Sequence, residues 1–147
     1  MVESVTYEAM GGQSALVKIN KIFYDKIYQH PWLKQYFSAI PQDRIEHQQV
    51  HFMQRVLGGP NTYMGKTPPM AHRHMFISEE LFQLRQKLLV ASFNEAHAHP
   101  ALREKWLALD EVFKKNIVKA SPADCIPRLS TEGVLNYPNT NSSRLTK

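Results

Sequence analysis

The sequence predicts an all-α fold. Apolar residues recur every three to four positions in four separate segments, which is the period of a helix with one buried face. Glycine and proline residues stand between these segments, where they favour turns and helix ends. No segment alternates apolar and polar residues as a half-buried strand does, and we see no internal repeat. We therefore expect one domain of four main helices and one short helical stub.

The first half of the chain holds two of these helices. One is predicted over residues 14–29 and ends before Pro31, because a residue that precedes proline disfavours helical geometry. Its apolar face comprises Leu16, Ile19, Phe23 and Ile27. An aromatic-rich turn follows over residues 32–37. The next helix is predicted over residues 43–57 and ends at a Gly-Gly pair. Its expected apolar face comprises Ile45, Gln49, Phe52, Met53 and Val56.

The second half holds the other two helices. Residues 58–70 are rich in glycine and proline and predict a loop, and a short helical stub is expected around residues 70–75. Ser78 is typical of an N-cap, and the two glutamates after it suit the positive end of a helix that runs over residues 79–97. Pro100 begins the last helix. The residues spaced for its buried face are Leu102, Trp106, Leu109, Phe113 and Ile117.

The composition changes after residue 119. The remainder of the chain is rich in serine, threonine, asparagine and proline and has no helical period. This composition is typical of a segment that is flexible or loosely packed over a domain. The expected organisation is a folded domain over residues 1–119 and a C-terminal tail over residues 120–147.

Bulk composition excludes several classes of protein. The chain has 147 residues and a single cysteine, Cys125, so it lacks an internal disulfide framework. No apolar run is long enough to span a membrane and the first residues lack a secretory pattern, so we expect a cytoplasmic protein without membrane contact. The net charge of +5 is spread over every helix and not clustered, so we expect no nucleic-acid partner.

A glutamine and two histidines on the second helix are candidate functional residues. Gln49 lies within the expected apolar face, and a buried amide without a partner costs about 1–3 kcal/mol. Either a core group or a bound ligand must therefore satisfy it. His47 and His51 are four residues apart, a spacing that can hold a metal ion, but they lie opposite the apolar face with no third ligand nearby. They are interpreted as surface histidines.

A second pair of histidines, His72 and His74, lies in the apolar segment MAHRHMFI. In a helical stub these side chains would point roughly 200° apart, so only one can face the interior. That histidine is either a structural core residue or the axial ligand of an iron porphyrin. The sequence has no Gly-x-Ser-x-Gly elbow and no phosphate-binding glycine loop, so it gives little support to hydrolase or nucleotide chemistry.

Several blocks of the chain resemble the truncated haemoglobins of group I. They are YEAMGG near the start, FYDKIYQHPWLKQYF, VLGGPNTYMG, MAH followed by Ile77, and Phe82. The resemblance covers about residues 7–119, with matching spacing between the blocks. It implies a globin-like, truncated two-over-two helical sandwich that encloses haem b, in which the glycine pairs permit tight bends.

The resemblance also implies which residues face a ligand on the distal side of the haem. Tyr24 matches the family's distal tyrosine, and Gln49 matches a distal glutamine. Gln48 lies at the edge of the same helix face. Ile45 matches a distal position that is histidine, glutamine or leucine in relatives, and its side chain cannot form a hydrogen bond. Tyr24 and Gln49 are thus the expected hydrogen-bond donors.

The implied iron ligand is His72, because its spacing from Gly58 and from Phe82 matches group I relatives. His74 is the rival, since Arg73-His74 resembles the pattern of another group. That group has an aromatic residue three positions later, whereas Phe76 is only two positions later. The other expected porphyrin-packing residues are Phe37, Phe52, Met53, Tyr63, Phe76 and Phe82.

The function that the resemblance implies is reversible binding of O₂, NO and CO at a five-coordinate ferrous haem iron, by a monomer. The alternative is a nitric oxide dioxygenase or another haem redox enzyme. Such an enzyme would need an external reductase as a partner, because the chain has no flavin or nicotinamide motif. A helical interaction module without haem is a third possibility, and a colourless protein that takes up no haem would support it.

Overall fold

The computed structural model describes residues 6–59, 74–121, 123, 125 and 134–137. These residues form four α-helices and one 3₁₀ helix, namely α1 (Gly12–Gln29), η1 (Leu33–Phe37), α2 (Gln42–Val56), α4 (Glu79–Ala96) and α5 (Pro100–Ile117). Within the described ranges the only extended pairing is two isolated parallel bridges. The all-α prediction is confirmed, and the predicted ends of the first three long helices are within two residues of the observed ends.

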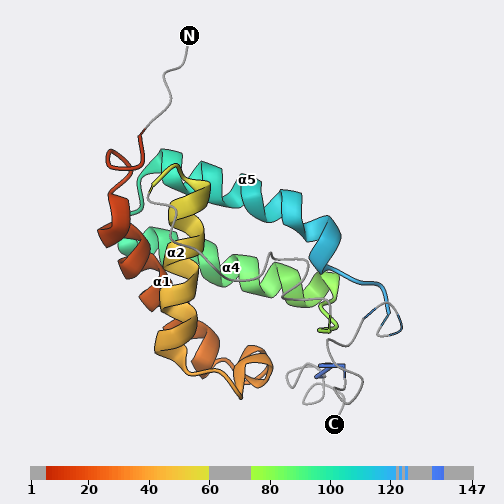
Figure 1. The fold of residues 1–147 in the computed structure, drawn as a ribbon. Helices are drawn as coiled ribbons and strands as arrows, with labels where there is room; N and C mark the ends of the chain where they lie inside the picture. Colours follow the sequence, from red (N-terminus) through yellow and green to blue (C-terminus); the bar gives the residue numbers. More distant parts are fainter. Residues whose placement is uncertain (1–5, 60–73, 122, 124, 126–133, 138–147) are drawn as a thin grey trace.

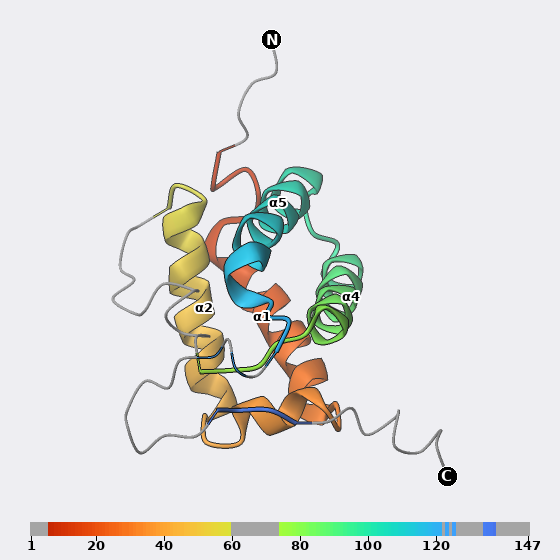
Figure 2. The same ribbon diagram turned by 90° about the vertical axis from the view of Figure 1, so that its right-hand side faces the viewer.

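The helices form two layers of two. Figure 1 shows α1 and α2 side by side, with α4 and α5 lying across them, and Figure 2 shows α4 and α5 almost end-on. Helix α1 lies at the centre of this arrangement, because it contacts both α2 and α4. The arrangement is the two-over-two globin-like sandwich that the resemblance implies. No helix in the described part of the chain combines the length and apolar composition that a membrane span requires.

The residue that caps the N-terminus of helix α1 is a glycine that no other residue can replace without strain. Gly11 caps the helix with φ of 107°, and a Cβ atom added there would lie 2.6 Å from the Cβ atom of Ala15. The buried face of α1 is the predicted one, and it comprises Leu16, Ile19, Phe23 and Ile27. Asn20 is also buried on this face, and its amide donates a hydrogen bond to the Leu16 carbonyl (2.9 Å).

The ends of α4 and α5 are fixed by local capping contacts. The Ser78 hydroxyl accepts a hydrogen bond from the backbone N–H of Leu81 (3.2 Å), which confirms the predicted N-cap of α4. His99 caps α5, since its Nδ1 atom accepts from the Ala101 N–H (3.0 Å). The two helices then pack through Phe93 and Trp106, whose ring centroids are 5.3 Å apart.

Candidate functional site

Tyr24, the predicted distal tyrosine, lies at the centre of an aromatic cluster between α1 and η1. Its side chain is buried, and its ring centroid lies 4.9 Å from that of Phe23 and 6.0 Å from that of Phe37. The hydroxyl makes no hydrogen bond with any described residue. Burial raises the pKa of Tyr24 well above its ordinary value, so the phenol keeps its proton. Tyr24 therefore offers a protonated hydroxyl that the described protein does not satisfy.

Helix α2 packs into the protein through a wider face than the predicted one. Its buried residues are Val50, Met53 and Gln54, whereas Val56 is 40% exposed. Gln49 is half-buried, and the buried amide of this helix is that of Gln54. The predicted face is confirmed at Met53, which is buried, and at Ile45 and Phe52, which pack against the core, but it is wrong at Val56.

A second, half-buried stripe runs along α2 beside the packed face. It comprises Ile45, Gln49 and Phe52, with Gln48 next to it, and these four residues are the predicted distal residues of this helix. The side-chain amides of Gln48 and Gln49 form no hydrogen bond with the described residues. The Phe52 ring lies 6.4 Å from that of Phe113 on α5. The structure thus places two apolar side chains on one helix surface, together with two side-chain amides that have no hydrogen-bond partner among the described residues.

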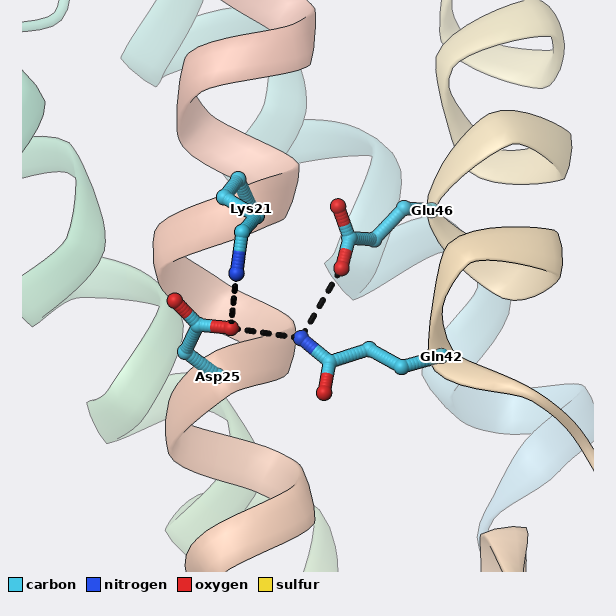
Figure 3. Close-up of polar contacts among 4 residues, drawn as sticks. All are labelled: Lys21, Asp25, Gln42 and Glu46. Atoms are coloured by element: carbon cyan, nitrogen blue, oxygen red, sulfur yellow. Dashed lines mark hydrogen bonds and ion pairs between the residues drawn. The ribbon is translucent and has the colours of Figure 1, made fainter.

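A polar cluster fixes α1 against α2 next to these distal residues (Figure 3). Gln42 on α2 donates hydrogen bonds to Asp25 on α1 and to Glu46 (2.9 Å), and Lys21 pairs with Asp25. The hydrogen bond from Lys21 is the main reason that the pKa of Asp25 is lowered, and Gln42 adds to it. Since Asp25 follows Tyr24 in the sequence, the cluster sets the separation of the two helices beside the predicted ligand donors.

Of the predicted proximal residues, His72 and Tyr63 lie outside the described residues. The rival His74 is 1% exposed, and its carbonyl accepts a hydrogen bond from the Leu135 N–H (2.9 Å). Phe76 is half-buried and fixed at both backbone groups. Its N–H donates to the Leu135 carbonyl (2.7 Å), and its carbonyl accepts from the Tyr36 hydroxyl (3.2 Å).

The C-terminal segment 134–137 packs on η1 and on this proximal region, as Figure 2 shows for the blue segment beside η1. The Trp32 indole donates to the Tyr137 carbonyl (2.7 Å), and the Tyr137 N–H donates to the Tyr36 hydroxyl (3.2 Å). Leu135 forms an isolated bridge with Met75. Sequence reasoning missed these contacts, and Leu135 and Tyr137 in a polar tail were the only signal for them.

Phe82, another predicted porphyrin-packing residue, is buried between two cations. The Arg85 guanidinium carbon lies 5.5 Å from its ring centroid and the Lys114 ammonium 5.8 Å from it. Arg85 also forms an ion pair with Asp110 on α5, which is 8% exposed. Sequence reasoning missed this pair.

The surface interpretation of His47 and His51 agrees with the structure. Their rings are 4.3 Å apart, His47 is exposed and His51 is half-buried. Within the described residues, no third histidine, cysteine or carboxylate joins them in a group that could hold a metal ion.

Comparison with known proteins identifies related chains. The bacterial-like globin family profile matches residues 5–118. Group 1 truncated haemoglobins of Tetrahymena pyriformis and Tetrahymena thermophila are 33% and 31% identical over 89 and 93 residues, which cover 60% and 63% of this chain and 74% and 77% of those chains.

Solved structures give the same result for the fold. Truncated haemoglobin from Tetrahymena pyriformis in the Fe(III) form matches with a TM-score of 0.67 and 28% identity, covering 76% of this chain and 96% of that one. A thermostable haemoglobin from Thermobifida fusca shares the fold alone, with a TM-score of 0.71, 20% identity, and coverage of 80% of this chain and 100% of that one. The chain belongs to the bacterial-like globin family, among the group 1 truncated haemoglobins, and is thereby a globin of the kind that binds small diatomic gases through haem.

Proposed function

We propose that this chain binds haem b and takes up O₂, NO and CO reversibly, with Tyr24 and Gln49 as hydrogen-bond donors to the ligand and His72 as the iron ligand. The observation that carries the proposal is the buried side chain of Tyr24, whose hydroxyl makes no hydrogen bond with the described residues. Haem iron, when bound, supplies the coordination position for the diatomic ligand.

The described residues fit a porphyrin. Phe37, Ile45 and Phe52 are half-buried apolar side chains at the edge of the core. Such side chains can bury the flat apolar surface of a macrocycle. One short segment carries two histidines, and His74 of this pair is buried. An imidazole side chain is therefore available as an iron ligand.

The distal residues account for ligand retention. The Tyr24 hydroxyl has no partner among the described residues, and a hydrogen bond that it donates to the ligand contributes about 1 kcal/mol. Gln49 or Gln48 can donate a second bond from α2. Ile45 has no lone pair to offer to iron, so this position of α2 leaves the sixth coordination site to the external ligand. These arguments support a five-coordinate ferrous state.

Solved structures of the Tetrahymena pyriformis relative include variants at a tyrosine and at glutamines, the same residue types as the proposed distal donors of this chain. They include variants of that protein in which a tyrosine is replaced by phenylalanine and a glutamine by glutamate, all in the Fe(III) form. In this chain a tyrosine and two glutamines are the polar side chains that we assign to the distal side.

The iron ligand is tested by the absorption spectra of His72→Ala and His74→Ala beside the purified parent protein. We expect His72→Ala to lose the parent's haem spectrum and His74→Ala to retain it. The opposite result would transfer the iron ligand to His74. A parent protein that takes up no haem would refute the proposal as a whole.

The distal donor is tested by O₂ dissociation from Tyr24→Phe. Loss of one hydrogen bond of about 1 kcal/mol should speed dissociation roughly fivefold. Tyr28→Phe is the matched control, because Tyr28 lies one turn later on α1 and its hydroxyl donates to the Ile40 carbonyl (2.8 Å). An unchanged rate in Tyr24→Phe, or an equal change in both variants, would remove Tyr24 from the ligand site.

A further inference from the structure

The ion pair between Arg85 and Asp110 differs from the other ion pairs among the described residues. It is bidentate, with Nη1 to Oδ2 at 2.8 Å and Nη2 to Oδ1 at 3.2 Å. The Asp110 side chain is 10% exposed, whereas the carboxylates of the other described pairs are 41–55% exposed. Taking two charges out of water is costly, and an apolar pair of similar size is often as stable. A contribution to stability alone therefore does not account for this pair.

The positive end of the pair points toward α1. The Arg85 guanidinium carbon lies 5.6 Å from the ring centroid of Phe23, and Phe23 and Tyr24 are in edge-to-face contact. Asp110, the negative end of the pair, lies on α5. The pair thus forms a dipole across the helices, with its cation next to the aromatic cluster that contains Tyr24.

The electrostatic effect on Tyr24 follows this orientation. Burial is the largest influence on the pKa of Tyr24 and raises it. Arg85 opposes burial by lowering this pKa, and its effect is larger than that of Asp110, which raises it. The pKa of Tyr24 therefore responds more strongly to the Arg85 cation than to the Asp110 carboxylate. Within an interior of low dielectric constant, such interactions are much stronger than in water.

We propose that Arg85, held in place by Asp110, is a positioning residue that strengthens the hydrogen bond donated by Tyr24 to the bound ligand. A cation beside a phenol favours negative charge on the phenol oxygen, so the O–H becomes a stronger donor. This inference rests on the proposed function, in which Tyr24 is the distal donor. It adds that donor strength is set from α4 and α5.

The test uses the C–O stretching frequency of the CO complex of the holoprotein, which falls as the field at the ligand oxygen becomes more positive. We expect Arg85→Met to raise this frequency and to speed O₂ dissociation about threefold, less than Tyr24→Phe does, because the hydroxyl remains. Arg85→Lys, which keeps the charge, should stay close to the parent protein. Arg85→Gln combined with Asp110→Asn removes both charges but keeps a polar pair without a buried unpaired carboxylate. It should shift both readouts in the same direction as Arg85→Met but by less, because the opposing carboxylate is removed as well.

Lys114→Met is the matched control for loss of one cation. Lys114 lies over the same Phe82 ring as Arg85, but it pairs with the exposed Glu79, and among the described residues it is Arg85 that lies over Phe23. We expect its CO frequency and O₂ dissociation rate to equal those of the parent protein. A shift as large as that of Arg85→Met would mean that any lost positive charge suffices, and it would overturn the proposal.

A double-mutant cycle separates failure of this inference from failure of the proposed function. If Arg85 acts through Tyr24, Arg85→Met should change neither readout when it is added to Tyr24→Phe. An equal change in both backgrounds, or none in the parent, would refute the role of Arg85 while Tyr24 remains the donor. If Tyr24→Phe itself changes nothing, the proposed distal donor is wrong and this inference falls with it.

Discussion

Tyr36→Phe should uncouple the C-terminal segment from the proximal region while it preserves the packing of the ring. The Tyr36 hydroxyl forms two hydrogen bonds: it donates to the Phe76 carbonyl and accepts from the Tyr137 N–H, both at 3.2 Å. Its ring contacts that of Tyr137 edge-to-face at 4.9 Å, and phenylalanine keeps this contact. The substitution therefore removes hydrogen bonds and leaves the apolar packing nearly unchanged.

The magnitude follows from those two bonds. Each contributes about 0.5–1.5 kcal/mol, so the free energy of unfolding should fall by about 1–3 kcal/mol. For a chain of this length, 2 kcal/mol lowers the thermal midpoint by roughly 4–8 °C. The measurement is thermal unfolding followed by circular dichroism, in parallel with the parent protein.

Tyr28→Phe serves again as the control, because the Tyr28 hydroxyl makes only one hydrogen bond, to the Ile40 carbonyl. It should cost about half as much as Tyr36→Phe. In addition, only Tyr36→Phe of these two variants should speed the transfer of haem to an acceptor protein, since Tyr36, unlike Tyr28, bonds to Phe76, two residues after the candidate iron ligand His74. Equal stability and equal haem loss in the two variants would refute this account of the C-terminal segment.

Three further substitutions probe the frame of the site. Leu89→Ala should destabilise the protein by about 2–5 kcal/mol, because Leu89 is completely buried, whereas Leu88→Ala should cost less; urea unfolding compares them. Gln42→Glu places a third carboxylate in the cluster of Figure 3 and should cost about 1 kcal/mol, and a cost that salt does not reduce would contradict the electrostatic explanation. His30 accepts two backbone N–H bonds at Nδ1 and burial lowers its pKa, so its contribution to stability is present above pH of about 6.5 and is lost as the pH falls below it. The parent protein should therefore lose more stability than His30→Asn between neutral and acidic pH, and identical acid profiles would show that folding leaves the pKa of His30 unchanged.

The helices could be predicted from the sequence because their signals are local. Ser78 and Pro100 mark helix starts through contacts within one turn, and the buried face of α1 follows from periodicity alone. The face of α2 was predicted only in part because this helix has two inward surfaces. Val50 belongs to one and Gln49 to the other, and apolar residues occur on both, so periodicity could not separate them.

The parts of the site that sequence reasoning missed depend on contacts between distant residues. Asp110 looks like a surface carboxylate in its own helix, and it is buried only because Arg85, 25 positions earlier, pairs with it. The docking of the C-terminal segment likewise requires Trp32 and Tyr36 from the other end of the chain. The resemblance to a family could not supply these contacts, because it extends only to residue 119.

The contact between the Trp32 indole and the Tyr137 carbonyl joins residues 105 positions apart. During synthesis, a chain is released from the ribosome beginning with its N-terminus, and loop closure over such a distance comes late in folding. The four α-helices of the described residues are complete in sequence before Tyr137 has been made. The helical frame can therefore assemble on the ribosome ahead of its C-terminal closure, and a chain that stalls or is cut before Tyr137 retains these four helices but loses this closure.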